Sequence, residues 1–398
     1  MKYDFTTVLD RMGNDAIAVE FPTSPRGFQP EGTKDGYSII PMWVADMNFM
    51  TAPSIVEAIQ KRAAHASFGY FSPREEYYDA IISWQKRRYH VDITREVIGY
   101  ENGVLGALSS ALAAFTEPGE KVFLHGPSYI GFLHTLESMN RPTSVSDLVL
   151  DDQGILRMDF DDIEKHFEED QIRFAIFCSP HNPAGRVWER WEIEKFVELC
   201  LKHNVIIFSD EIWCDLVLNG YQHIPTHSVS EEAKKITITA YAPTKTFSLA
   251  GLVGSYHVIF NEELRDKVRK VSSATHYNGM NVLSQHALIG AYSKEGEEWL
   301  DELRQVLTEN VDYACDYISR YEGIEFVKPQ GTYMLYLDCT KFLEARGTDI
   351  EKMLKYGWER GVIWQDGRPF GKENSIRINL GLPLWQIKEA IARLEKKD

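Results

Sequence analysis

The chain has 398 residues and a formal net charge of −16; 44% of its residues are hydrophobic and 26% are charged. This length allows a large core and about two domains, and the composition is typical of globular proteins. The acidic excess argues against nucleic acid and anionic membranes as partners, because both bind basic surfaces.

The cysteine pattern indicates a reducing compartment. There are five cysteines, an odd number, and none form a Cys-x-x-Cys pair, which argues against a disulfide framework or a zinc site. Met1–Phe5 lacks the apolar stretch of a signal peptide, and no apolar run reaches the roughly eighteen residues that a membrane span needs. We therefore expect a cytoplasmic protein without a metal site and without membrane contact.

Residues 1–50 contain several prolines and glycines and show no sustained periodicity. We expect them to form an extended arm associated with a small C-terminal domain. Helical patterns follow the arm. One begins at Ala52, before a Pro-Ser start signal, and a second surrounds Tyr77 and Trp84.

Residues 51–285 are expected to form a large domain in which short apolar strands alternate with amphipathic helices such as Glu192–His203. This alternation predicts a mostly parallel sheet with helices on both faces, and ligands bind such sheets at the carboxyl ends of their strands. The predicted strands are Val97–Tyr100, Lys121–His125, Phe174–Cys178, Val205–Ser209, Ile236–Tyr241 and Ser255–Ile259.

Residues 286–398 are expected to hold a linker helix and a small α+β domain. One long helical pattern runs from about Asn281 to Tyr321. The pattern beyond it predicts strands at Glu325–Val327, Tyr333–Leu337 and Ser375–Asn379, and helices at Asp349–Arg360 and Leu384–Lys396.

Lys245 stands where a predicted strand ends, two residues after Pro243. The proline ends the strand because it cannot donate to a ladder of hydrogen bonds. A lysine held near the sheet can be partly desolvated, which lowers its pKa, and it can form a Schiff base with a carbonyl compound. Taken alone, a solvated surface charge remains the commoner explanation for a lysine.

Two loops after predicted strands have unusual sequences. Glu101–Ala107 places Gly103 at the start of a helix, where backbone N–H groups could approach a phosphate, although a plain strand-to-helix turn has the same pattern. Cys178–Gly185 carries two prolines and a glycine that direct the Asn182 amide. A packing turn would explain the prolines but not the asparagine between them.

Two charged residues lie in apolar surroundings. Asp210 ends a very apolar strand, where a carboxylate needs a cationic or N–H partner such as a protonated pyridine nitrogen. A helix N-cap would be an equally good explanation. Arg377 lies mid-strand between Ile376 and Ile378, where it can bind a substrate carboxylate or form an internal salt bridge.

Together these residues meet the needs of one cofactor. A phosphate cup, a carboxylate for a ring nitrogen, a lysine for a Schiff base and an arginine for a carboxylate are what pyridoxal phosphate requires when it acts on an amino acid. The sequence therefore predicts an enzyme that binds pyridoxal 5′-phosphate and a small amino-acid substrate.

The chain resembles, over essentially its whole length, the class I/II aminotransferase superfamily of pyridoxal phosphate enzymes. The resemblance implies an α/β fold like that of aspartate aminotransferase, with a mostly parallel seven-stranded sheet in the large domain and a small α+β domain. The motifs that carry it are Asn102-Gly103-Val104, Ser179-Pro180-His181-Asn182-Pro183-x-Gly185, Ser209-Asp210-Glu211-Ile212, Pro243-Thr244-Lys245-Thr246-Phe247 and Arg377-Ile378-Asn379.

Within that superfamily the chain is similar to the cystathionine β-lyase branch of cystalysin-like C–S lyases. The segments that suggest this branch are Tyr3–Thr6, Pro41–Met47, Ser179–Pro183 and Gly185–Trp188. Many transaminases have a tyrosine at the position of Trp213 and an arginine at that of Val253, and the lyase branch lacks both. Three positions depart from the branch pattern, namely Asn48, Thr244 and Ser248.

The resemblance implies roles for individual residues. Lys245 would bind the cofactor and then act as the base at Cα, while Asp210 would hold the ring nitrogen. Tyr129 would stack on the ring; core packing is the alternative for this tyrosine. Asn182 would bind the phenolic oxygen, beside Trp213.

The remaining implied contacts concern the phosphate, the substrate and a second subunit. The phosphate would bind Gly103, Val104, Leu105 and Thr244, together with Tyr70 of the neighbouring subunit of a homodimer. Arg377 would bind the substrate carboxylate, with Asn182 and the backbone of Val44 and Ala45 nearby.

The motifs fit more than one reaction. The branch favours β-elimination from cystathionine or cysteine, which yields pyruvate, ammonia and a thiol. An aminotransferase is one alternative, and a cofactor-binding protein that acts by binding a regulatory partner is another.

Overall fold

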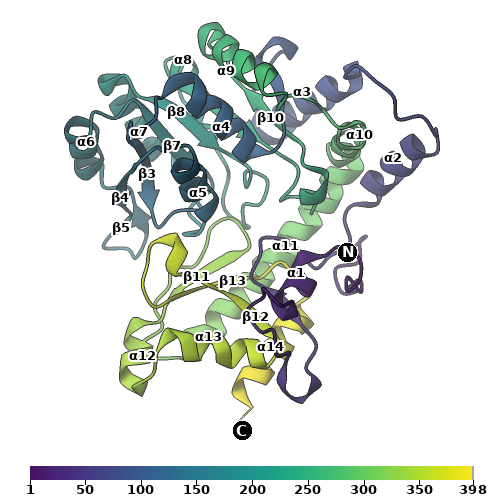
Figure 1. Cartoon of the computed structure of the whole chain (residues 1–398), viewed down its shortest axis with the longest axis vertical. Coiled ribbons are helices and arrows are strands. Elements are labelled where there is room, and N and C mark those ends of the chain that lie inside the picture. The colour runs from purple at the N-terminus through teal and green to yellow at the C-terminus, as the bar shows by residue number, and fades with distance from the viewer. Residues whose placement is uncertain (397–398) are drawn as a thin grey trace.

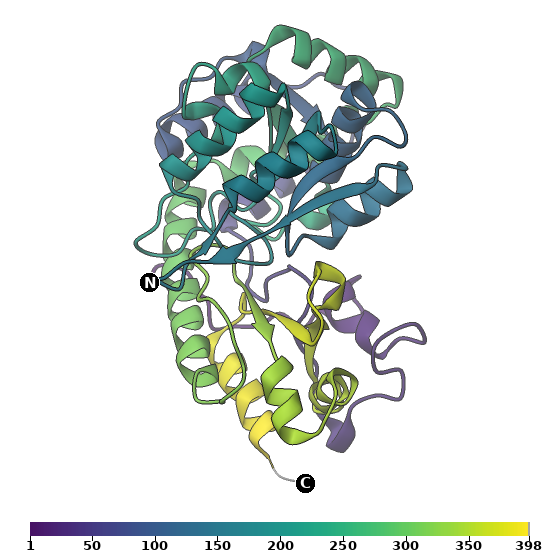
Figure 2. The ribbon, with the colours of Figure 1, turned by 90° about the vertical axis from the view of Figure 1, so that its left-hand side faces the viewer.

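The computed structural model describes residues 1–396 and has two parts, one above the other in Figure 1. The upper part surrounds a seven-stranded sheet and the lower part a four-stranded sheet. Helix α11 (Lys294–Ile318) runs along both parts, as Figure 2 shows at its left side. None of the helices in the described part of the chain is long and apolar enough to cross a membrane.

The large sheet has the strand order β2-β10-β9-β8-β7-β3-β4 and is mostly parallel. Strands β9, β8, β7, β3 and β4 are parallel to one another, and only β10 runs against its two neighbours. The strands are β2 (Ile98–Glu101), β3 (Val122–Gly126), β4 (Thr143–Asp147), β7 (Phe174–Cys178), β8 (Ile206–Asp210), β9 (Thr237–Tyr241) and β10 (Ser255–Val258).

The sequence predicted six of these seven strands to within about one residue at either end. It missed β4, whose residues alternate between exposed and buried. An edge strand of Thr, Ser and Asp around a single valine does not give the apolar run that marks a strand buried on both faces. The implied seven-stranded α/β fold is nevertheless confirmed.

Helices cover both faces of the large sheet (Figure 1). Helix α10 packs against α2 and α3 at the upper right of this view. The helices of the upper part are α2 (Pro53–Ala63), α3 (Glu75–Tyr89), α4 (Val104–Phe115), α5 (Ile130–Ser138), α6 (Phe160–Glu169), α7 (Arg190–His203), α8 (Ala233–Ile236), α9 (Glu262–Ala274) and α10 (Val282–Ala291). A two-stranded hairpin, β5 (Val149–Leu150) and β6 (Leu156–Arg157), lies beside them.

The single long helix predicted from Asn281 to Tyr321 is wrong, because the chain forms α10 and α11 with a break at Tyr292 and Ser293. Ser293 starts the second helix by accepting a hydrogen bond from the Gly296 backbone, 3.1 Å away. Serine is a preferred N-cap residue, and this signal competes with the apolar periodicity that continues through it.

The small sheet has the order β1-β12-β13-β11, and its first strand comes from the N-terminal arm. Within residues 1–50 the chain forms only a one-turn helix, α1 (Ile17–Glu20), two short 3-10 turns and β1. The remaining elements are β1 (Ile40–Met42), β11 (Met334–Asp338), β12 (Val362–Asp366), β13 (Ser375–Asn379), α12 (Thr340–Arg346), α13 (Ile350–Glu359) and α14 (Leu384–Glu395).

One prediction for this part of the chain is wrong, and two elements were not predicted. Glu325–Val327 forms no strand but only a single bridge between Glu325 and Asp338. The sequence also missed β12 and α12. Strand β12 ends in Gln365 and Asp366, and its polar end shortens the apolar run from which a strand is predicted.

Candidate active site

A pocket of about 450 Å³ lies at the carboxyl ends of the parallel strands, between the two sheets. Segments from all parts of the sequence meet there, as the parallel topology requires. Of the predicted site residues the structure brings together Val44, Ala45, Gly103, Val104, Leu105, Tyr129, Asn182, Asp210, Trp213, Thr244, Lys245 and Arg377.

Lys245 lies in the turn that follows β9, with its amine pointing across the pocket. Its Nζ donates a hydrogen bond to the Ala45 carbonyl oxygen over 3.0 Å. Burial lowers the pKa of this amine, and the nearby Arg377 guanidinium lowers it further. The lysine is therefore not the solvated surface charge that was the commoner expectation, and more of it is neutral and nucleophilic than of a solvated lysine.

Asp210 is buried at the end of β8. One of its carboxylate oxygens accepts a hydrogen bond from the Ile212 backbone over 3.0 Å. No helix begins here, so the N-cap explanation is wrong. Burial raises the pKa of Asp210 to about 7, which reflects the lack of a close cation among the residues described.

Arg377 is buried on β13 and contacts oxygens that carry no net charge. Its guanidinium donates to the Asn182 side chain over 3.0 Å, to the Trp43 carbonyl over 3.3 Å and to the Gln365 side chain. No carboxylate among residues 1–396 pairs with it, so the expected alternative of an internal salt bridge is wrong. Burial lowers its pKa to about 10, and its Nε has no hydrogen-bond partner.

The N-terminus of α4 forms one wall of the pocket. Gly103 precedes this helix with a φ of 82°, which residues with a side chain rarely adopt. The first N–H groups of a helix have no partner within it, so those of Val104 and Leu105 can bind an anion in the pocket. The Thr244 hydroxyl lies at the same pocket.

Two aromatic side chains complete the pocket. Tyr129 precedes α5, and its ring fits closely over Gly131, where a Cβ atom would lie 2.3 Å from the ring. The ring therefore contacts the pocket and also packs against its own helix. Trp213 is buried edge-to-face against Tyr333, with ring centroids 4.9 Å apart.

Some residues of the site were not predicted. These are Trp43, Gln365 and Asn379. Trp43 and Gln365 accept hydrogen bonds from Arg377, and Asn379 holds the strap formed by residues 43–46 by donating to the carbonyls of Val44 and Asp46 over 2.7 and 2.8 Å. Asn379 was part of a quoted motif but received no role. Gln365 lies on β12, the strand that the sequence did not reveal.

Comparison with known proteins decides the family. The family model for aminotransferases of class I and II matches residues 38–394. The chain belongs to this family.

One relative of the chain is cystathionine beta-lyase PatB of Bacillus subtilis, which is 35% identical over 89% of this chain and 92% of PatB. Cystalysin from Treponema denticola, solved with pyridoxal 5′-phosphate, is 31% identical with a TM-score of 0.91, covering 99% of this chain and 98% of cystalysin. A pyridoxal phosphate-bound putative aminotransferase from Clostridium difficile 630 is 34% identical with a TM-score of 0.89, covering 98% of each chain.

The class I/II site fits the pyridoxal phosphate that these neighbours contain. A helix N-terminus suits the phosphate, and an unpaired buried carboxylate, Asp210, suits a protonated ring nitrogen. The amine of Lys245 faces the same space. Trp213, which has no hydroxyl, and the side-chain amide of Asn182 line the same pocket.

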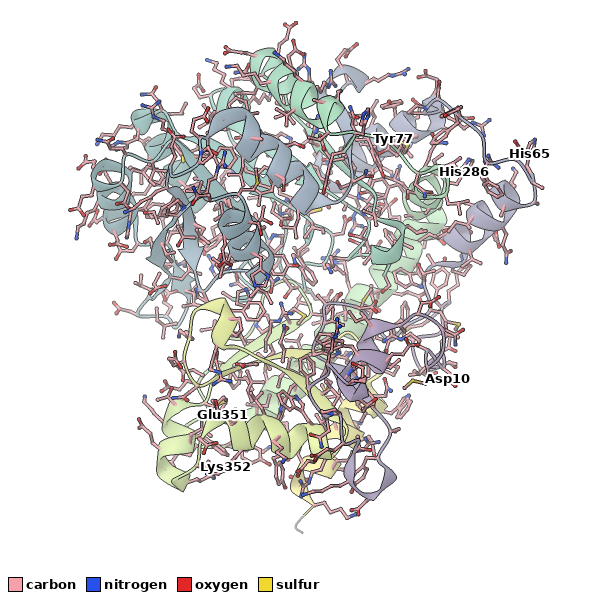
Figure 3. All side chains as sticks on the ribbon, viewed as in Figure 1. Asp10, His65, Tyr77, His286, Glu351 and Lys352 are labelled. Atoms are coloured by element: carbon pink, nitrogen blue, oxygen red, sulfur yellow. The ribbon has the colours of Figure 1, made fainter. Side chains whose placement is uncertain are left out.

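Tyr70 is the one predicted site residue that lies outside the pocket of its own chain. It is fully exposed in the segment between α2 and α3. Figure 3 labels His65, which begins this segment at the outer edge of the upper part. The predicted contact between Tyr70 and the phosphate would therefore have to be made in the pocket of a second subunit.

A cluster of Glu164, Glu168 and His203 lies on α6 and α7, away from the pocket, and its ligand atoms are within 4.8 Å of one another. The ammonium group of Lys202 already pairs with the Glu164 carboxylate, so it supplies the positive charge that a metal ion would otherwise provide. This cluster takes no part in the pocket.

Asp210→Asn is expected to stabilise the cofactor-free protein at pH 8. The folded-state pKa of about 7 exceeds the ordinary value of 3.8, so the folded protein binds more protons than the unfolded chain between these values. This carboxylate therefore destabilises the fold progressively as pH rises from about 4 to about 7. The asparagine removes a penalty of at most about 4 kcal/mol.

Urea unfolding of the cofactor-free variant and parent at pH 5 and pH 8 measures this effect. The gain should be larger at pH 8 and should be absent in Asp152→Asn, which changes an exposed aspartate in the turn between β5 and β6. Equal gains at both pH values would contradict the assignment.

Proposed function

We propose that this chain is a pyridoxal 5′-phosphate-dependent C–S β-lyase. It cleaves substrates of the cystathionine or cysteine type to pyruvate, ammonia and a thiol. The observation that carries the proposal is a buried arginine, Arg377, without a carboxylate partner, in the same pocket as the buried amine of Lys245. PatB and cystalysin, with their coverage of nearly the whole chain, support the lyase branch.

Arg377 binds the α-carboxylate of the amino acid. A carboxylate presents two oxygens to the guanidinium fork, and the pair is strong because both partners are charged and shielded from water. Asn182 and Gln365 hold the guanidinium by neutral oxygens, which leave its charge uncompensated. The site therefore selects amino acids before any chemistry occurs.

Lys245 removes the proton from the substrate Cα. Burial and Arg377 lower its pKa, so a larger share of the amine is neutral and able to accept a proton at Nζ. The bound cofactor supplies an aldehyde for the amines and an electron-accepting ring, kept protonated by Asp210. Tyr129 packs on one side of that space.

The overall reaction consumes water and breaks the Cβ–S bond. The sulfur leaves with the bonding electron pair and takes up a proton as a thiol. The three-carbon remainder is hydrolysed to pyruvate, and its nitrogen leaves as ammonia. No oxidant or keto-acid acceptor enters this balance, whereas a transaminase requires such an acceptor.

Pyruvate release from cystathionine, cysteine and cystine, measured side by side, tests this function. A lyase forms pyruvate without any oxo acid, in equal amounts with ammonia. Turnover that requires an added oxo acid would replace the lyase by an aminotransferase.

The free, buried state of all five cysteines agrees with a reducing compartment, and we place the protein in the cytoplasm.

We further propose that the enzyme is a homodimer in which Tyr70 reaches the phosphate site of the partner. Its full exposure, and the exposed Phe68 beside it, support an intersubunit contact. A pocket of one subunit would then need the tyrosine of the other.

Complementation between two variants tests this arrangement. Tyr70→Ala and Lys245→Ala should each have little activity, and mixing them should restore it. A mixed dimer contains one pocket with an intact lysine beside an intact tyrosine. Mixing either variant with itself, through the same unfolding and refolding step, is the control. No recovery in a mixture shown to contain mixed dimers would contradict the shared site.

A further inference from the structure

A second cavity, of about 470 Å³, lies in the lower part of the molecule, behind the small sheet. Helices α11, α12, α13 and α14 enclose it on the other sides. Figure 1 shows these helices grouped below and beside the small sheet, and Figure 3 labels Lys352 on α13, one of the residues at this cavity.

The small sheet separates this cavity from the active site. On β13, Arg377 lines the active-site pocket, while its neighbour Ile378 lines the cavity. On β12, Gln365 lines the active-site pocket, while its neighbour Trp364 lines the cavity. Successive side chains of a strand point to opposite faces, so the two spaces lie on opposite faces of one sheet. The cavity is therefore not an extension of the substrate pocket.

The interior of the cavity is apolar. Residues such as Leu337, Ile378 and Leu380 line its sheet side, and Ala314 and Ala390 line its helical side. Its volume lies within the range of small-molecule sites, which are apolar with a few placed polar groups.

Besides the tyrosines Tyr317, Tyr321 and Tyr356 and Thr348, the cavity is lined by two exposed cationic side chains, Arg346 and Lys352. The Arg346 guanidinium lies 3.8 Å from the centre of the Phe342 ring, and no carboxylate within residues 1–396 pairs with it. Lys352 is also at the cavity and contacts Asp349 over 2.8 Å. In a chain of net charge −16 this unpaired guanidinium is a local feature and not part of a general positive field.

We propose that the cavity binds an amphipathic monocarboxylate with an apolar tail of about ten carbons. The tail fills the apolar interior, and the carboxylate accepts hydrogen bonds from Arg346. Charge complementarity at the mouth of the cavity selects this occupant. Arg346 is exposed there, so a carboxylate can pair with it, whereas a neutral hydrocarbon gains no such pair and a polar anion leaves the interior unfilled.

Calorimetric titration of the cofactor-bound protein with decanoate, below its micelle concentration, tests the proposal without any turnover. Saturable binding of one decanoate per chain is expected. Arg346→Gln should weaken decanoate binding about five-fold and leave the binding of neutral 1-decanol unchanged. Lys355→Gln, on α13 but outside the cavity, should change neither.

Filling the cavity provides the second test. Ala390→Leu, or Ala314→Leu if the first variant misfolds by circular dichroism, should weaken both ligands more than ten-fold, because the added carbons occupy the tail site. Three results would overturn the proposal: no saturable binding to the parent protein, unchanged binding in a folded cavity-filled variant, or equal loss of decanoate and decanol in Arg346→Gln. Failure of pyruvate release would leave these binding results untouched.

Discussion

Lys245→Ala is expected to lower the rate of pyruvate release by more than about 10⁴-fold, because in the proposed function one amine serves both as the cofactor's attachment point and as the base. Its contact with the Ala45 carbonyl and its lowered pKa place a reactive amine inside the pocket. Steady-state assays with saturating cofactor measure the loss. Borohydride reduction followed by peptide mass analysis should locate the cofactor on Lys245 in the parent and on no lysine in the variant.

A matched control is Lys202→Ala, which removes an exposed lysine that pairs with Glu164 on the surface. Both the rate and the labelled peptide should be unchanged in this control. If an added small amine partly restores the activity of Lys245→Ala, the role of Lys245 as the base is distinguished from its role as the attachment point of the cofactor. Substantial activity without an added amine, or a reduced adduct on another lysine, would contradict the assignment.

Arg377→Leu is expected to lower kcat/KM about 100-fold for every amino-acid substrate, mainly through KM. The guanidinium is buried and has no carboxylate partner in the described chain, so a substrate carboxylate is the charge that it can bind. The loss should not depend on the group attached to sulfur. Initial rates over a range of cystathionine, cysteine and cystine concentrations measure it.

Arg377→Lys separates charge from geometry. A lysine keeps the positive charge but loses the planar fork, so an intermediate loss of about ten-fold is expected. Arg141→Lys is the control, because Arg141 is also buried but bonds to Thr116 and Met139 and does not line the pocket. A loss confined to one sulfur substrate would show that Arg377 contacts the leaving group instead.

The strands of the large sheet were predictable because they are buried on both faces. Burial on both faces demands continuous apolar runs such as Phe174–Cys178, and the same burial makes a charged residue at the strand end conspicuous. Asp210 stands out for this reason. The edge strand β4 has one solvent-facing side and gives no such signal.

The explanations left open for single residues were decided by three-dimensional contacts. Whether Arg377 pairs with a carboxylate depends on segments that lie 195 and 334 residues away, at Asn182 and Trp43. The strap that Asn379 holds is likewise a contact between segments 335 residues apart. Local sequence patterns carry no information about the distance in space between such segments.

Tyr70 shows the same limit in another form. The resemblance to the family implied its role, yet the structure places it outside the pocket of its own chain. A residue that serves a second subunit has no partner within one chain, so a single chain leaves the prediction untested.

The sequence by itself determined the cofactor chemistry and the buried strands of the large sheet, because residue types at strand ends follow from what a buried site must bind. Only the tertiary structure decided that Arg377 has no carboxylate partner within residues 1–396, that α10 and α11 are separate helices, and that an apolar cavity lies behind the small sheet. These properties depend on packing between segments far apart in the chain. Side-chain alternation predicts two faces for every strand, but only the assembled molecule shows what each face meets.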